Sequence, residues 1–280
     1  TGGNVTLEAG GLGGAQDGRL YMATSSTFTA IGTEAHSIGG GFTASSSATI
    51  SAANSTFTFT ATSSNKLINA QVPVTFYNLT FSGTSGGWNL QNAATTTVSN
   101  TFAMTAGTLS GTGNVAISSG ALSGNGTITM TGGTVQIAST GNLGSNTEWQ
   151  FNKLTLGAGS VGATTKTGTA TTTILGVLRV NTSHTLNAGS GGWELAGGGT
   201  PFIVNGTFDV DTAPFYYTSN SATNVEDATY DYLVLAPSAA GSPTYTIQPG
   251  SSLAASALTI GDGTNPVTVT ADASDPAVDF

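Results

Sequence analysis

Apolar and polar residues alternate in short runs along most of the chain, and glycine separates many of the runs. The runs at 57–60, 115–117 and 208–211 read FTFT, VAI and FDVD, with a large apolar residue at every second position. Side chains on a β-strand point alternately to its two faces, so such runs predict strands with one buried and one wet face. No segment shows sustained helical spacing of apolar residues, and the chain is therefore predicted to be all-β.

A 13-residue period is visible in the middle of the chain. Leu109, Leu122 and Val135 recur at this spacing, and a glycine lies two positions before each of them. Stacked coils produce short periods of this kind, because each coil places equivalent side chains above those of the coil before. The period predicts a parallel β-helix, a β-solenoid. Its successive units are expected to stack the following interior pairs: Leu109 on Leu122, Val115 on Ile128, and Ile117 on Met130.

A longer recurrence overlies the short one and leaves an alternative open. Segments 76–81, 151–156 and 230–235 resemble one another, and their central leucines, Leu79, Leu154 and Leu233, stand at nearly equal intervals along the chain. The alternative fold is a row of tandem β-sandwich domains of about 75 residues, with these segments as equivalent core strands. The 13-residue period favours the solenoid, because sandwiches do not produce such short periods.

The chain shows no clean domain boundary, but its two ends differ from its middle. Residues 1–45 are rich in glycine and alternate weakly, so they are predicted to form an atypical first layer or cap. Residues 46–271 are the predicted solenoid body. Residues 272–280 read as a departing tail or linker.

Composition narrows the class of protein. Among 280 residues there are 40 Gly, 50 Thr and 30 Ser, no Cys, and only 7% charged residues, against about 25% in ordinary domains. These values disfavour a cytosolic enzyme and exclude disulfides and Cys-based metal sites. No run approaches about 18 consecutive apolar residues, so no membrane span is predicted. The chain begins at Thr1 with no leader sequence, so any signal peptide is expected to have been removed, or the chain to be part of a longer one.

The charge is concentrated in the last third of the chain. Before residue 200 five acids balance five bases, whereas residues 200–280 contain nine acids and no base, which accounts for the net charge of −9. Phosphate binding needs a basic patch, so nucleic acid is not an expected partner.

The texture of the strands resembles that of known surface proteins. The sequences TLSGTGNVAIS at 108–118, NGTITMTGG at 125–133 and FIVNGTFDVD at 202–211 are similar to the β-helical passenger regions of bacterial autotransporters and filamentous-haemagglutinin-like adhesins. The segment FYNLTFSG at 76–83 looks like repeats of giant secreted bacterial proteins. This resemblance covers most of residues 55–270, fixes no functional residue, and implies an extracellular or cell-surface location with a structural or adhesive role.

Candidate chemistry is sparse. Asp209 and Asp211 alternate with Phe208 and Val210, so both carboxylates are expected to point outward from one strand. The pair is read first as a solvated face, with a calcium site or a hydrolytic pair as alternatives. Calcium is the only cofactor considered, and no catalytic residue is assigned. The two histidines are expected in surface or turn positions. Six sequons provide possible glycan acceptors: Asn4, Asn54, Asn78, Asn125, Asn181 and Asn205.

These observations favour an extracellular structural protein, a β-solenoid that forms part of a surface filament, sheath or stalk. Its expected partner is another copy of itself, joined end to end through the β-prone segments that contain Val5, Leu7, Val267 and Val269. The first alternative is an adhesin that binds glycans or matrix through its polar lateral face. The second is a polysaccharide-degrading enzyme.

Overall fold

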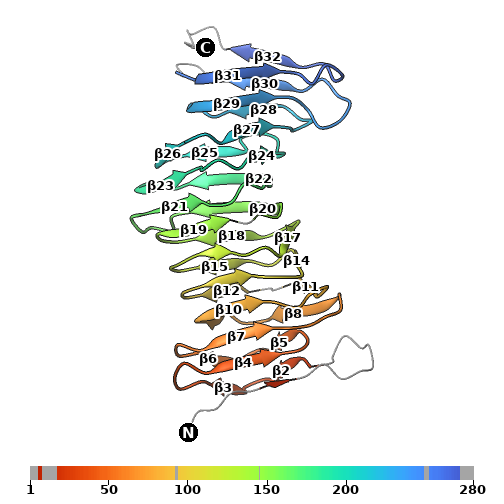
Figure 1. Cartoon of the computed structure of the whole chain (residues 1–280), viewed down its shortest axis with the longest axis vertical. Coiled ribbons are helices and arrows are strands. Elements are labelled where there is room, and N and C mark those ends of the chain that lie inside the picture. Colours follow the sequence, from red (N-terminus) through yellow and green to blue (C-terminus); the bar gives the residue numbers. More distant parts are fainter. Residues whose placement is uncertain (1–5, 8–17, 92–93, 145, 249–251, 272–280) are drawn as a thin grey trace.

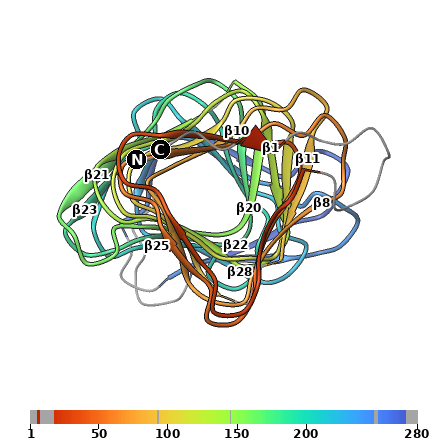
Figure 2. The ribbon, with the colours of Figure 1, turned by 90° about the horizontal axis from the view of Figure 1, so that it is seen from below.

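A computed structural model of the chain shows an all-β protein whose parallel strands stack as a β-solenoid of about 11 turns. It describes residues 6–7, 18–91, 94–144, 146–248 and 252–271, and side-chain burial from residue 18 onward within these ranges. The strands lie across the long axis, and the coils follow one another along it (Figure 1). Seen along that axis, the chain winds repeatedly around a common centre (Figure 2). The solenoid prediction is confirmed, and the tandem-sandwich alternative is wrong.

Three columns of strands run along the solenoid. Column A is a single parallel sheet. Its members are β1 (Thr6–Leu7), β4 (Ala35–Ile38), β7 (Thr56–Phe59), β10 (Asn78–Phe81), β13 (Phe102–Met104), β16 (Leu122–Ser123), β19 (Gly141–Gly144), β21 (Gly162–Lys166), β23 (His184–Asn187) and β26 (Thr207–Asp209).

Column B follows column A in each coil. Its members are β2 (Leu20–Met22), β5 (Phe42–Ala44), β8 (Lys66–Ala70), β11 (Gly87–Leu90), β14 (Thr108–Gly111), β17 (Thr127–Met130), the first halves of β20 (Trp149–Leu156) and β22 (Thr172–Val180), β24 (Trp193–Leu195) and β27 (Pro214–Tyr217). The later residues of β29 (Thr229–Leu235) and β31 (Ala254–Ile260) continue it.

Column C completes each coil. Its members are β3 (Thr27–Thr29), β6 (Thr49–Ser51), β9 (Val74–Phe76), β12 (Thr96–Val98), β15 (Val115–Ile117), β18 (Thr134–Ile137), the second halves of β20 and β22, and β25 (Phe202–Val204). In the last coils β28 (Thr223–Val225), β30 (Thr244–Ile247) and β32 (Thr268–Ala271) form a separate three-stranded sheet.

The coil is longer than the 13-residue period. Leu79 pairs with Phe57 in the coil before it and with Phe102 in the coil after it, and Phe102 pairs in turn with Leu122. One coil therefore leads from position 57 to 79, the next from 79 to 102, and the next from 102 to 122. Each of these coils contains three strands, and the 13-residue step spans only two of them. The period therefore aligned Leu109 in column B with Leu122 in column A.

The predicted interior is confirmed, but the predicted stacking is wrong. All six residues of the predicted interior pairs are buried. Leu109 pairs with Ile128, however, and Val115 with Val135. Ile117 likewise pairs with Ile137. Alternation fixes which face of a strand is buried, whereas register depends on how many strands make a coil.

The longer recurrence has no equivalent in the coil geometry. Leu79 lies in column A, Leu154 in column C and Leu233 in column B. The three similar segments therefore occupy three different sides of the solenoid. Their likeness reflects the common need for an apolar residue at every second position.

The two terminal regions differ in how far they are described. Within residues 1–45, β2 and β5 pair as coils of the same solenoid, Leu20 with Phe42 and Phe42 with Ile68. The predicted tail at 272–280 lies outside the described residues.

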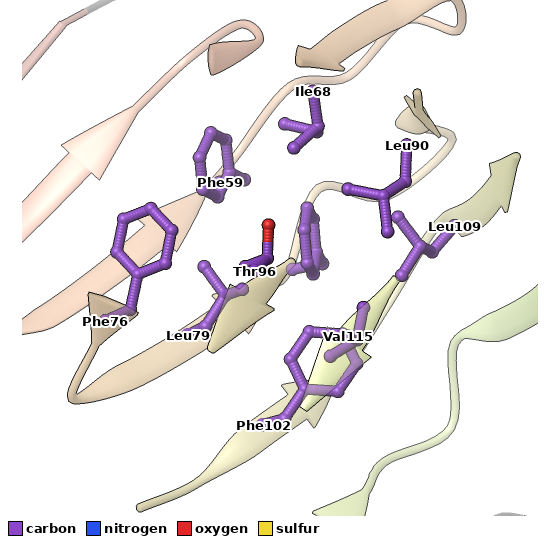
Figure 3. A pocket seen from close by; sticks show the side chains of 10 residues that line it. Phe59, Ile68, Phe76, Leu79, Leu90, Thr96, Phe102, Leu109 and Val115 are labelled. Carbon is purple, nitrogen blue, oxygen red and sulfur yellow. The ribbon is translucent and has the colours of Figure 1, made fainter. Parts of the chain in front are cut away.

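The interior is tightly packed with apolar side chains. Figure 3 shows part of it, where phenylalanine, leucine and isoleucine side chains from successive coils meet. The cavity that they line measures only about 10 Å³. Trp88, Trp149 and Trp193 lie in column B, and each indole N–H donates to a buried carbonyl oxygen, at 3.2, 2.8 and 3.1 Å. Burial of these large rings without an unsatisfied polar atom stabilises the fold.

The corners hold the coils at backbone contact distance. At Gly83 a Cβ would lie 1.7 Å from the Ala61 carbonyl oxygen of the preceding coil, so this corner admits no side chain. Asn78 and Asn100 stack on one another, and the Asn100 amide donates to the Asn78 side-chain oxygen at 2.9 Å. Such stacking of small polar side chains is suited to a repeat in which each coil contacts only its neighbours.

We expect Leu122→Asp to unfold the protein or to lower its melting temperature strongly. Leu122 is fully buried between Phe102 and Leu143, and the variant would bury an unpaired carboxylate there, at a cost of several kcal/mol, roughly 3–5. Ser123→Asp, on the next and outward position of β16, is the matched control and should change stability by less than about 1 kcal/mol. Thermal unfolding followed by circular dichroism measures both, and equal melting of the two variants would contradict the inward position of Leu122.

Candidate functional site

Two adjoining hollows lie on the outer face of column B. The first has a volume of about 330 Å³ and the second about 470 Å³, and Glu148 and Thr173 line both. We call them together the column-B groove. Its lining residues are Thr127, Ile128, Thr129, Thr147, Glu148, Trp149, Gln150, Thr171, Thr173, Glu194, Tyr216 and Thr218.

Alternation along the strands places the polar residues of this groove outward. Trp149, Trp193 and Phe215 are buried in the interior, so the residue after each one points to the outer face. Gln150 pairs with Thr173, Thr173 with Glu194, and Glu194 with Tyr216. These four side chains therefore form an axial row with about 4.8 Å between neighbours.

The carboxylate of Glu194 is held by the coils on both sides. One oxygen accepts a hydrogen bond from the Thr173 hydroxyl at 2.9 Å, and the other accepts one from the Thr218 hydroxyl at 3.0 Å. Each carboxylate oxygen still has a lone pair for a further donor. Glu194 is thus an oriented acceptor on the groove wall.

Tyr216 contributes an aromatic side chain beside this carboxylate. Its ring lies against the backbone of Gly192, where a Cβ would come within 3.1 Å of the ring carbon Cε2. The side chain is half-buried, so part of its surface faces solvent. An aromatic ring flanked by hydroxyls and carboxylates is suited to bind a ligand that has both apolar faces and polar edges.

Sequence reasoning did not find this groove. Gln150, Thr173, Glu194 and Tyr216 lie in four successive coils, each a full coil from the next, so they align only when the coil length is known. The signal was present in Trp193-Glu194-Leu195, in which an acidic residue lies between two inward-pointing apolar residues.

The predicted aspartate pair has a different geometry from the expected one. Strand β26 ends at Asp209, and Asp211 follows in a turn with a left-handed φ of 52°. The Asp211 backbone N–H donates to the Asp209 carboxylate at 3.3 Å. The expectation that both carboxylates share one strand face is wrong because the strand ends between them. Calcium binding there stays a prediction, and the described residues contain no cluster of three or more His, Asp or Glu that could hold a metal.

The described strands of the segments predicted to self-associate, β1 and β32, lie at opposite ends of the solenoid (Figure 1). The backbone of Leu7 pairs with Ile38 in β1, and Val5 lies outside the described residues. At the other end Val269 pairs with Tyr245 in β32, and Val267 comes just before that strand. Both valines are partly buried against the core.

The sequon asparagines fall into two groups. Asn54, Asn125 and Asn205 lie in turns with exposed side chains, so their amide nitrogens are accessible to modification. The side-chain amides of Asn78 and Asn181 are engaged, since Asn78 donates to the Thr56 hydroxyl at 3.1 Å and Asn181 donates to the Gly157 carbonyl. Asn4 lies outside the described residues.

Both histidines are buried, contrary to the sequence expectation. His36 packs against Phe28 and Phe57, with ring centroids 5.1 and 4.7 Å away. The His184 ring nitrogen Nε2 hydrogen-bonds the Thr164 hydroxyl at 2.9 Å. Burial lowers the pKa of both rings, so they are neutral interior groups at pH 7.

Lys166 is a buried cation-forming group in the interior behind the groove. Its Nζ donates to the Gly192 carbonyl oxygen and lies 4.9 Å from the centre of the Trp193 ring. Burial removes water from the ammonium and lowers the pKa of Lys166 to about 7. In the sequence, only the alternation within β21 marks Lys166 as a buried residue, because it places this lysine at an inward position.

Comparisons with known proteins add no functional assignment. The chain matches no protein-family model, no curated protein and no solved structure. Within the part of the chain that the structure describes, no helix has the length and apolar character that a membrane crossing requires.

We expect stability to rise between pH 7 and pH 9 because of Lys166. In this range the folded protein releases the Lys166 proton, whose pKa is about 7, while the unfolded chain keeps it up to about pH 10.5. The unfolded state then binds more protons, so the free energy of unfolding increases with pH, by at most about 2.5 kcal/mol. Urea unfolding at pH 7, 8 and 9 measures the increase.

Lys166→Met should remove this increase, and Lys153→Met, which replaces an exposed lysine of β20, should retain it. An equal pH dependence in wild type and Lys166→Met would show that Lys166 is not the titrating group.

Proposed function

We propose that this chain is an extracellular structural protein, a segment or subunit of a surface filament, sheath or stalk. Its partner would be another copy of itself, stacked end to end. The observation that carries this proposal is the stacking of parallel coils up to both ends of the described chain. Among the described strands, β2 and β3 pair on one side only, as do β31 and β32 at the other end.

Open strand edges support axial growth, because unpaired backbone N–H and C=O groups can accept a further strand. In a solenoid this addition repeats the contact already made between coils, so the interface is heterologous and generates an open filament. No new kind of contact is needed for the chain to extend.

The C-terminal coil also exposes apolar surface. A pocket of about 220 Å³ opens there, and its eight lining residues are Leu233, Leu235, Ile247, Leu253, Leu258, Ile260, Val269 and Ala271. Ile260 is 53% exposed. A further coil placed on this end would bury the exposed surface of Leu258, Ile260, Val269 and Ala271, at a gain of about 25 cal/mol per Å² of apolar surface.

The negative charge of the last third of the chain favours end-to-end over side-by-side assembly. All nine acids of residues 200–280 lack a neighbouring base in the sequence, so like charges disfavour side-by-side packing of this region. The low charged fraction and the absence of cysteine, together with the resemblance of the repeats to bacterial surface proteins, support an extracellular location. The proposal assigns the chain a structural role and no reaction.

We expect the purified chain to form end-to-end oligomers whose length grows with concentration. Sedimentation velocity gives their size, and negative-stain electron microscopy shows whether they are rods. Ile260→Glu places a charge on the apolar end and should shorten the rods strongly. Val161→Glu is the matched control, because Val161 is 84% exposed between β20 and β21 on the lateral surface.

Rods of equal length in wild type and Val161→Glu, with mostly single chains in Ile260→Glu, would support axial stacking. Single chains in all three proteins at high concentration would contradict the proposal, as would side-by-side dimers that both variants retain.

A further inference from the structure

We propose that the column-B groove binds a linear polysaccharide whose sugars carry protonated amino groups, of the polyglucosamine type. This inference goes beyond a structural role, since it gives the lateral face of the rod a ligand. It rests on the shape of the groove, the oriented carboxylate of Glu194, the ring of Tyr216 and the charge of the lining.

The shape of the groove suits a chain-like ligand. The two hollows adjoin through Glu148 and Thr173 and extend from β17 to β27. These strands belong to five successive coils, so the groove spans four coil spacings, or about 19 Å along the axis. The hollows are open to solvent, so a polymer can lie along them without its ends being enclosed. A single small molecule would leave most of the groove unoccupied.

The groove offers the contacts that a sugar ring requires. Tyr216 provides an aromatic surface for the apolar face of a ring. At the edge of the ring the Thr171 hydroxyl can donate or accept, and the Thr173 hydroxyl, whose proton is donated to Glu194, can accept. The carboxylate of Glu194 is already held by two threonine hydroxyls, so binding does not have to order it. These features favour a saccharide over a purely charged ligand.

Charge selects the class of saccharide. Glu148 and Glu194 both line the groove, and among the described residues no lysine or arginine lines either hollow. Uronic acids and sulfated sugars would be repelled. A protonated amine would instead donate charge-assisted hydrogen bonds to the carboxylates. The two glutamates lie two coils apart, about 10 Å along the axis, so a polymer with an amine on each sugar can contact both.

The direct test compares two hexasaccharides of the same length and linkage, hexaglucosamine and hexa-N-acetylglucosamine. Isothermal titration calorimetry at pH 6 and low salt should show binding of hexaglucosamine at least tenfold tighter than that of its neutral counterpart. Glu148→Gln and Glu194→Gln should each weaken hexaglucosamine binding about fivefold or more and leave the melting temperature unchanged, because glutamine keeps the shape of the side chain.

Asp209→Asn is the matched control, because it removes an exposed carboxylate from column A and should leave the affinity unchanged. Tyr216→Ala should weaken both hexasaccharides, since stacking on the ring does not depend on the amine. Hexalysine and calcium chloride serve as competing probes.

Four results would overturn the proposal. Two concern the sugars: hexaglucosamine does not bind at millimolar concentration, or the two hexasaccharides bind equally. The other two concern the controls: Asp209→Asn weakens binding as much as the glutamate variants do, or hexalysine binds as tightly as hexaglucosamine. Calcium binding that is lost in Glu194→Gln, without sugar binding, would identify a cation site instead. None of these results depends on whether the chain forms filaments.

Discussion

Backbone hydrogen bonds between successive coils are the interaction on which the rest of this structure depends. Every strand pair in the described chain is parallel, and turn residues extend the same pattern, as where the Ser118 N–H donates to the Val98 carbonyl at 2.8 Å. Because these bonds fix the coil spacing at about 4.8 Å, each side chain lies directly above its partner in the coil before. Interior rings, corner glycines and outward polar rows all follow from that alignment.

The same alignment creates the lateral groove and the open ends. Residues that are one full coil apart in the sequence become axial neighbours, so a glutamine, a threonine, a glutamate and a tyrosine from four successive coils form one surface. The end coils have strand edges that no other described strand covers, because a solenoid does not close on itself. A rod with a binding face and extendable ends is therefore a direct consequence of coil stacking.

Sequence patterns predicted the strands, the solenoid and the inward face of each strand. Leu109, Leu122 and Ile117 were placed in the interior correctly because alternation reports burial directly. The register was wrong because a 13-residue step equals two strands, and alternation does not state how many strands close a coil. The groove was missed for the same reason, since Glu194 and Tyr216 become neighbours only at the correct coil length.

Buried polar groups were the other limit of sequence reasoning. Lys166 and His184 occupy inward positions, where the alternation would place apolar residues. Their partners, the Gly192 carbonyl and the Thr164 hydroxyl, come from the neighbouring coil. A single sequence shows the residue but not the partner that makes its burial tolerable.

Cysteine cross-linking tests the coil register most directly, because the chain contains no cysteine of its own. Ala116 pairs with Gln136 in the next coil, and both side chains point outward, so their Cα atoms lie at a distance that a disulfide can bridge. A 13-residue coil would instead pair Ala116 with Thr129. We predict that oxidised Ala116→Cys/Gln136→Cys monomer loses both free thiols, whereas Ala116→Cys/Thr129→Cys keeps them. The reverse result would contradict the three-column solenoid.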